Sequence, residues 1–169
     1  MTESEMFTEL KAEIIAQVWG ASSNVVFPTG CVAITVNADL AMVGAIKSMR
    51  TPWCLLQPLE STTDPEFDED PNLVQMNLLC RIMVSVPGDT VGENPLMGAN
   101  KTGGSTKSEG RGLFEIEQEL FNAIGKVNAL EGVILQCRQK GAAQTALYDG
   151  GSVYVAFRDF RFEAMGTLV

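Results

Sequence analysis

The stretch Leu73–Pro87 (LVQMNLLCRIMVSVP) decides the fold class of this chain. Every second residue from Val74 to Val86 is apolar, which is the period of a β-strand with one buried face. The opposite face mixes apolar and polar residues, and is more apolar than a solvated sheet surface needs. It carries Leu73, Gln75, Asn77, Leu79, Arg81, Met83 and Ser85. We therefore predict a strand covered on both faces, the second by a helix or by a neighbouring subunit.

Two helical patterns stand before and after this strand. Near the N-terminus, Thr2 and Glu5 have the spacing of a capping box. Apolar residues follow at helical spacing and predict a buried face: Phe7, Leu10, Ile14 and Val18. Residues 113–127 predict a second helix, whose apolar stripe is Leu113, Ile116, Leu120, Ile124 and Val127. Phe114 and Phe121 lie off that stripe, so we expect either a second layer or another chain to cover them.

The remaining segments predict shorter elements. Strands are expected at residues 25–27, 52–59 and 133–138, and a final strand at 153–164. In that last strand the apolar set shifts by one residue, which predicts a bulge near Arg158 and Asp159. Asn37 or Asp39 can cap a short helix ending near Met49, with Leu40, Val43 and Ile46 on one face. We predict one α+β domain over residues 1–169, with a mixed, mostly antiparallel sheet and helices packed on one face.

Two connections are unusual in composition. Residues 60–72 form an acidic turn in which Asp64, Glu66 and Asp68 have the spacing that opens an EF-hand loop. Glu69 stands where that loop needs glycine, so we expect a solvated turn and no metal site. Residues 88–112 hold seven of the 16 glycines and predict a flexible arm. We expect this arm to order against a partner, through the basic residues Lys101, Lys107 and Arg111.

Composition narrows the class of function. Apolar residues make up 46% of the chain and charged residues 20%, as in ordinary globular proteins. The net charge of −9 argues against direct binding to nucleic acid or to an anionic membrane. The chain has no histidine and no C-x-x-C pair, so zinc sites of the usual spacing and histidine-based catalysis are not expected. We expect no cofactor, buried free thiols and a cytosolic protein without a membrane span.

Four stretches resemble the tail-terminator proteins of long-tailed bacteriophages and related neck and tail-completion proteins. They are DLAMVGAIKSMRTPWCLLQPLE, LVQMNLLCRIMVSVPG, LFEIEQELFNAIG and SVYVAFRDFRFEA, in the same order of elements. The resemblance implies a subunit of a hexameric ring that ends the tail tube and joins it to the head. It implies the tail tube protein and a head–neck connector protein as partners. DNA passes through such a ring, and an acidic wall keeps the duplex from adhering.

The expected interface follows from these patterns. Side chains that a monomer does not hide are assigned to subunit contacts: Leu73, Leu79, Arg81, Met83, Phe114 and Phe121. The protein is then expected in the host cytoplasm during assembly and in the virion afterwards, without enzymatic activity. Two alternatives stay open, namely another connector or tube subunit, or an enzyme that uses the carboxylates of the acidic turn.

Overall fold

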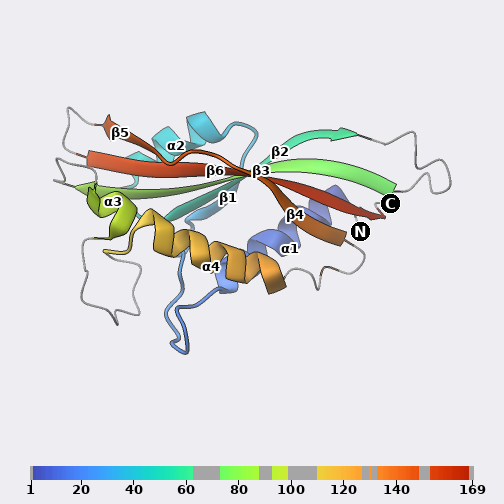
Figure 1. Ribbon diagram of the computed structural model, residues 1–169, viewed down its shortest axis with the longest axis horizontal. Coiled ribbons are helices and arrows are strands. Elements are labelled where there is room, and N and C mark those ends of the chain that lie inside the picture. The colour runs from blue at the N-terminus through green and yellow to red at the C-terminus, as the bar shows by residue number, and fades with distance from the viewer. Residues whose placement is uncertain are drawn as a thin grey trace.

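The described residues form a six-stranded mixed sheet with helices on both faces (Figure 1). The computed structural model describes residues 2–62, 73–87, 93–98, 110–126, 130, 133–148 and 153–167. The helices are α1 (Glu3–Ala16), α2 (Ala38–Lys47), α3 (Glu93–Met97) and α4 (Leu113–Lys126). The strands are β1 (Val32–Ile34), β2 (Trp53–Thr62), β3 (Leu73–Pro87), β4 (Val133–Lys140), β5 (Gln144–Tyr148) and β6 (Val153–Thr167).

The predicted long strand is the centre of the sheet. β3 pairs antiparallel with β6 in one unbroken register, from Leu73 opposite Thr167 to Pro87 opposite Val153. On its other side β3 pairs antiparallel with β2, and β1 adds a short parallel edge to β2. At the opposite edge, β4 and β5 each pair with a different half of β6. The predicted α+β class and mostly antiparallel sheet are confirmed.

The larger core lies between the sheet and the helices α1 and α4, which run below the sheet in Figure 1. Most of both predicted apolar helix faces is buried there, and so is the described part of the predicted buried face of β3. On this face of β3 the buried residues are Met76, Leu78, Cys80, Ile82 and Val84, none more than 2% exposed. Val18 lies beyond the end of α1 and is half-buried, and Val127 and the side chain of Val74 lie outside the described residues. The capping box of α1 is also present, with Glu5 N–H donating to Thr2 Oγ1 (3.2 Å) and Thr2 N–H donating to Glu5 Oε2 (2.7 Å).

The capping box makes α1 sensitive to acid. The hydrogen bonds from the Thr2 backbone and then its side chain lower the pKa of Glu5 from 4.5. A lowered folded-state pKa stabilises the fold fully above the ordinary pKa, and this contribution is lost as pH falls through the folded value. We expect Glu5→Gln to lower the midpoint of thermal unfolding at pH 7 but to have little effect at pH 2.5. Glu9→Gln on the same helix is the control, and an equal effect at both pH values would contradict the assignment.

A second core lies on the other face of the sheet, under α2. Met42, Ala45 and Ile46 of α2 pack on Leu55, Met83, Val155 and Phe157 of the sheet. The prediction that helices pack on one face was therefore wrong for α2, which lies above the sheet in Figure 1. The three apolar residues predicted on one face of this helix differ in burial: Ile46 is 8% exposed, whereas Leu40 and Val43 are 72% and 42% exposed. Small residues such as Ala38 and Ala45 face the sheet instead and allow a close approach.

The apolar shift in β6 has a cause other than a bulge. Val155 and Phe157 face α2, whereas Phe160 and Phe162 face α1 and α4. The register with β3 continues through Arg158 without a break, so the predicted bulge there was wrong. The apolar set changes faces because β6 contributes to one core at its start and to the other core at its end. The irregularity at this edge lies in β4, between Cys137 and Gln139.

Other expectations differ locally from the structure. Val25 forms only an isolated bridge with Val18, so residues 25–27 are no regular strand. Strand β5 was not predicted, because polar residues interrupt its apolar pattern. The predicted flexible arm contains α3, where Pro95 is buried and Leu96 packs against the larger core. Residues 63–72 of the acidic turn and residues 88–92 and 99–109 of the arm lie outside the described residues.

Candidate subunit interfaces

Two of the predicted interface residues are buried within a single chain. Met83 is 1% exposed in the second core, and Arg81 is 6% exposed beside it. Helix α2 covers both. The sequence pattern of β3 predicted that either a helix or a neighbouring subunit would cover this face, and in the structure it is a helix. The interface prediction was therefore wrong for Met83 and Arg81, because a layer of the same chain already removes them from solvent.

The other predicted interface residues fall into three situations. Phe121 is partly buried and packs edge-on against Phe160, with ring centroids 5.3 Å apart, so it completes the larger core. Phe114 is 41% exposed, and the Arg158 guanidinium lies 5.4 Å from the centre of its ring. Leu79 is half-buried on the face of β3 that α2 leaves partly uncovered. The side chain of Leu73 lies outside the described residues, so only Leu79 and Phe114 remain available candidates.

The predicted arm residues are only partly described. Lys101 and Lys107 lie outside the described residues. Arg111 lies 4.8 Å from the ring centre of Trp19 and forms an ion pair with Glu115 one helical turn later. This arginine therefore ties the start of α4 to the segment that follows α1.

An arginine with two carboxylates joins α2 to the sheet. Arg81 Nε and Nη2 donate to the two oxygens of Asp159 at 2.6 and 2.9 Å, and Nη1 donates to Asp39 Oδ1 at 2.6 Å. The hydrogen bonds from Arg81 to Asp159, ahead of those to Asp39, raise the pKa of the arginine above its usual value. Burial acts in the opposite direction but is outweighed. The guanidinium also lies 4.9 Å from the ring centre of Phe157, so a cation–π contact adds to its attachment beside the second core.

A second charged cluster lies between α4 and the sheet. Glu117 is 4% exposed and accepts hydrogen bonds from Arg158 at 2.8 and 2.9 Å. Lys140 Nζ contacts the same carboxylate at 2.9 Å. On the opposite face of the sheet, the buried Glu163 pairs with Arg138. These buried charges are neutralised by partners on neighbouring elements, which is the arrangement of a structural ion pair.

Two buried thiols lie on neighbouring strands of the sheet. Cys54 and Cys80 have their sulfur atoms 3.5 Å apart in the larger core. The hydrogen bond to Cys54, followed by burial, raises the pKa of Cys80 well above its usual value. A thiol held protonated in this way is a poor nucleophile and a poor metal ligand. Within the described residues, no group of three or more carboxylate and thiol side chains could hold a metal ion.

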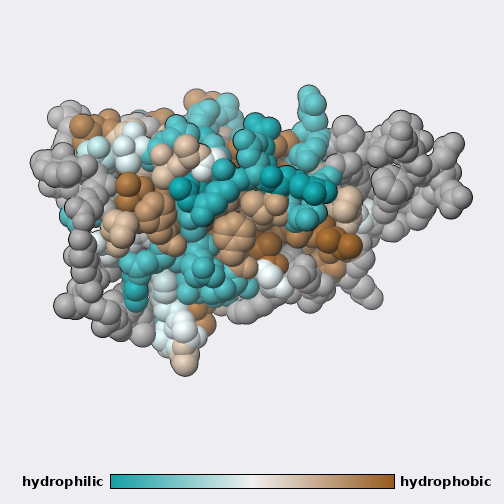
Figure 2. Space-filling model, viewed as in Figure 1, coloured by the Kyte–Doolittle hydropathy of each residue, from teal (hydrophilic) through white to brown (hydrophobic). Residues whose placement is uncertain are grey.

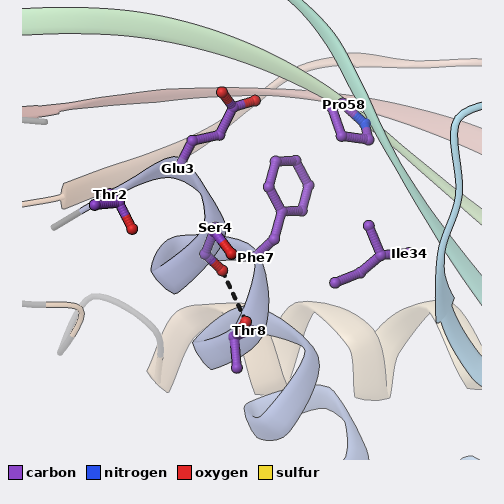
Figure 3. Close-up of a pocket in the computed structure, with 7 residues that line it drawn as sticks. All are labelled: Thr2, Glu3, Ser4, Phe7, Thr8, Ile34 and Pro58. Atoms are coloured by element: carbon purple, nitrogen blue, oxygen red, sulfur yellow. Dashed lines mark hydrogen bonds between the residues drawn. The ribbon is translucent and has the colours of Figure 1, made fainter.

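One edge of the sheet is hollowed. Phe7 of α1, Ile34 of β1 and Pro58 of β2 line a hollow of about 500 Å³. Figure 3 shows these three apolar side chains gathered around it, with Thr2, Glu3, Ser4 and Thr8 along α1. Ile34 is 42% exposed and lies on the edge strand β1. Phe7 is only 4% exposed, so it forms the floor of the hollow.

The opposite edge carries the complementary type of surface. Ile134 on β4 is 62% exposed and Leu147 on β5 is 56% exposed. Apolar atoms gather over the outer part of β4 in Figure 2. Arg138 and Lys140 lie on the same strand with about half of each side chain exposed. The run Val133-Ile134-Leu135 was the available sequence signal, because consecutive apolar residues place one on each face of a strand.

No protein-family model and no curated protein matches the sequence. Among the described helices, none has both the length and the apolar character to cross a bilayer.

Proposed function

We propose that this protein is a structural subunit that assembles head-to-tail into a ring, of the kind that ends a phage tail tube and joins it to the head. The observation that carries the proposal is the pair of different exposed surfaces at opposite edges of one sheet. The hollow beside β1 and the apolar side chains of β4 and β5 lie at its two ends. Contacts between unlike surfaces repeat from copy to copy and close into a ring when the rotation allows.

The two edges are suited to one another in shape. Ile134 and Leu147 project from strands whose outer edge is unpaired within the described residues, and such edges invite pairing with another chain. The hollow beside β1 is lined by apolar side chains and has room for one large aliphatic side chain of a neighbour. Inserting an exposed aliphatic side chain into an apolar pocket removes both surfaces from water, which favours association.

The charges of the two edges are also complementary. The exposed glutamates of α1, beside the hollow, are Glu3, Glu5, Glu9 and Glu13, against the single Lys11. At the opposite edge Arg138 and Lys140 keep about half of their side chains exposed even though each pairs within the chain. An acidic surface facing a basic one speeds encounter and disfavours the reversed orientation.

The proposal extends to the partners, the location and the charge of the assembled ring. Its two faces contact the tail tube protein and a head–neck connector protein, and the protein resides in the virion after assembly in the host cytoplasm. Six copies carry a net charge of −9 each, which repels a duplex in transit and avoids specific binding. Leu79 and Phe114 are the described residues that remain for contacts beyond the two edges.

Single-edge variants test the head-to-tail arrangement. Ile34→Asp and Ile134→Asp each change an exposed residue, so we expect both to fold and both to lose the ring in native mass spectrometry. Because each variant keeps one intact edge, an equimolar mixture should form mixed pairs that neither variant forms through its edges alone. Gln118→Asp on the exposed side of α4 is the control and should keep the ring. Rings that survive in both edge variants would contradict the proposal.

A further inference from the structure

The outer face of α2 carries apolar residues that the chain's own core does not use. Leu40 and Val43 are 72% and 42% exposed, and their spacing of three places them on one side of the helix. Val36, which precedes the N-cap Asn37, is 92% exposed. Met49, just after the helix, is 72% exposed. The inner face is already packed on the sheet through Met42, Ala45 and Ile46. This outer stripe is therefore available to another molecule, and a contiguous apolar patch of this kind marks an interaction site.

Charged residues of opposite sign lie at the two ends of this apolar stripe. Asp39 lies at its N-terminal end, with 81% of its side chain exposed, and Lys47 lies at the C-terminal end and is exposed. Arg81 donates to Oδ1 of Asp39, whereas Oδ2 meets no donor among the described residues. Gly44 lies beside Val43, and a Cβ added there would meet nothing within 4 Å. The face is thus acidic at one end, basic at the other and low in profile between them.

We infer that α2 packs antiparallel against α2 of a second copy of this chain. In that arrangement Asp39 of each copy faces Lys47 of the other, so both pairs form at once. The pairing centres on Val43, which meets its own counterpart across a two-fold axis. Val36 then lies near Met49 of the second copy, so the exposed apolar side chains cover one another. The absent side chain at Gly44 lets the two helices approach closely, as small residues do at helix contacts.

Charge complementarity favours a second copy over an unrelated partner. One helix supplies both the acid and the base, so a copy in reverse orientation satisfies both ends with nothing else required. The reversed orientation also places the positive end of each helix dipole near the negative end of the other. A contact that uses one surface twice is two-fold and cannot close a larger ring by itself. The inference therefore stands apart from the head-to-tail contact of the proposed function.

Cysteine cross-linking tests the two-fold axis. Val43→Cys places a thiol beside its counterpart, so diamide, which takes up the two electrons and two protons released, should convert most of this variant to disulfide-linked dimer. Ile134→Cys is more exposed in the parent chain but far from the proposed axis, and it is the matched control. Both are read on a non-reducing gel at equal concentration. Equal cross-linking of the two variants overturns the inference.

Sedimentation measures the same contact without a new thiol. In an Ile134→Asp background, which removes the head-to-tail edge, we expect a monomer–dimer equilibrium. Adding Leu40→Glu or Lys47→Glu should raise the dimer dissociation constant at least tenfold, with an unchanged circular dichroism spectrum. Lys47→Glu acts by facing Asp39 of the second copy with a like charge. A dissociation constant that neither change moves overturns the inference. A ring that the edge variants leave intact counts against the proposed function alone.

Discussion

Met83→Asp is expected to unfold the chain. Met83 is 1% exposed between β3 and α2, among Met42, Leu55 and Phe157. Losing a buried methionine costs about 2–5 kcal/mol, and burying a carboxylate without a partner adds several kcal/mol more. The sum is comparable to the whole stability of a typical domain, about 5–15 kcal/mol. We expect a far-ultraviolet circular dichroism spectrum of unfolded protein and no cooperative thermal transition.

Leu147→Asp is the control for this experiment. It makes a similar change on an exposed strand position, 56% exposed, and should leave the chain folded. The measurement also separates two accounts of β3. If Met83→Asp gave a folded monomer instead, its face would belong to a contact between subunits, as the sequence pattern alone allowed, and α2 would not cover it.

Arg81→Met is expected to destabilise the chain by about 3–5 kcal/mol, the cost of breaking a buried ion pair from one side. Asp159 would lose two hydrogen bonds at 2.6 and 2.9 Å while it stays mostly buried. Asp39 would lose one, but its exposed carboxylate is rehydrated at little cost. Urea denaturation of parent and variant gives the difference directly. Arg161→Met, two residues beyond Asp159 on β6, is the control, because that side chain is exposed and should change stability by less than about 0.5 kcal/mol.

The double variant Arg81→Met with Asp159→Leu shows whether Arg81→Met loses stability because the Asp159 carboxylate is left buried without a partner. Removing both partners takes away the uncompensated carboxylate, and apolar replacement of a buried pair is often nearly neutral. We expect the double variant to be more stable than Arg81→Met alone. A double variant that is less stable than either single variant would assign the loss to packing around Phe157 rather than to charge.

The parts of the fold that sequence predicted are those fixed by local periodicity. The alternation of β3, the capping box at Thr2 and the stripe of α4 each depend on residues a few positions apart. Their burial follows once the element forms, since one face is clearly more apolar than the other. For the same reason, the buried side of β3 was predicted without knowing what would cover it.

The remaining features depend on contacts between distant segments. Helix α2 is apolar on most sides, so its pattern could not show that Leu40 and Val43 face outward and Met42 inward. The orientation depends on contacts with distant strands, namely the packing of Met42 on the sheet and the hydrogen bond from Arg81 to Asp39, 42 residues apart. The apolar shift in β6 was read as a bulge because sequence alone does not reveal a second core. The same unseen layer led to the interface assignment of Met83. The hollow beside β1 joins three segments and has no signature in any one of them.

Strand β6 contributes side chains to both hydrophobic cores, so the sheet separates the two cores and contacts each of them. Phe157 packs in the second core and Phe160, three residues later, packs in the larger core. The pairing of β6 with β3 continues without a break along this stretch. A displacement of this strand by a load on α2 must therefore reach the packing of α1 and α4. Because protein interiors are close-packed and compress little, such a displacement is passed on rather than absorbed. The helix on one face of the sheet and the two helices on the other are thus mechanically connected through β6.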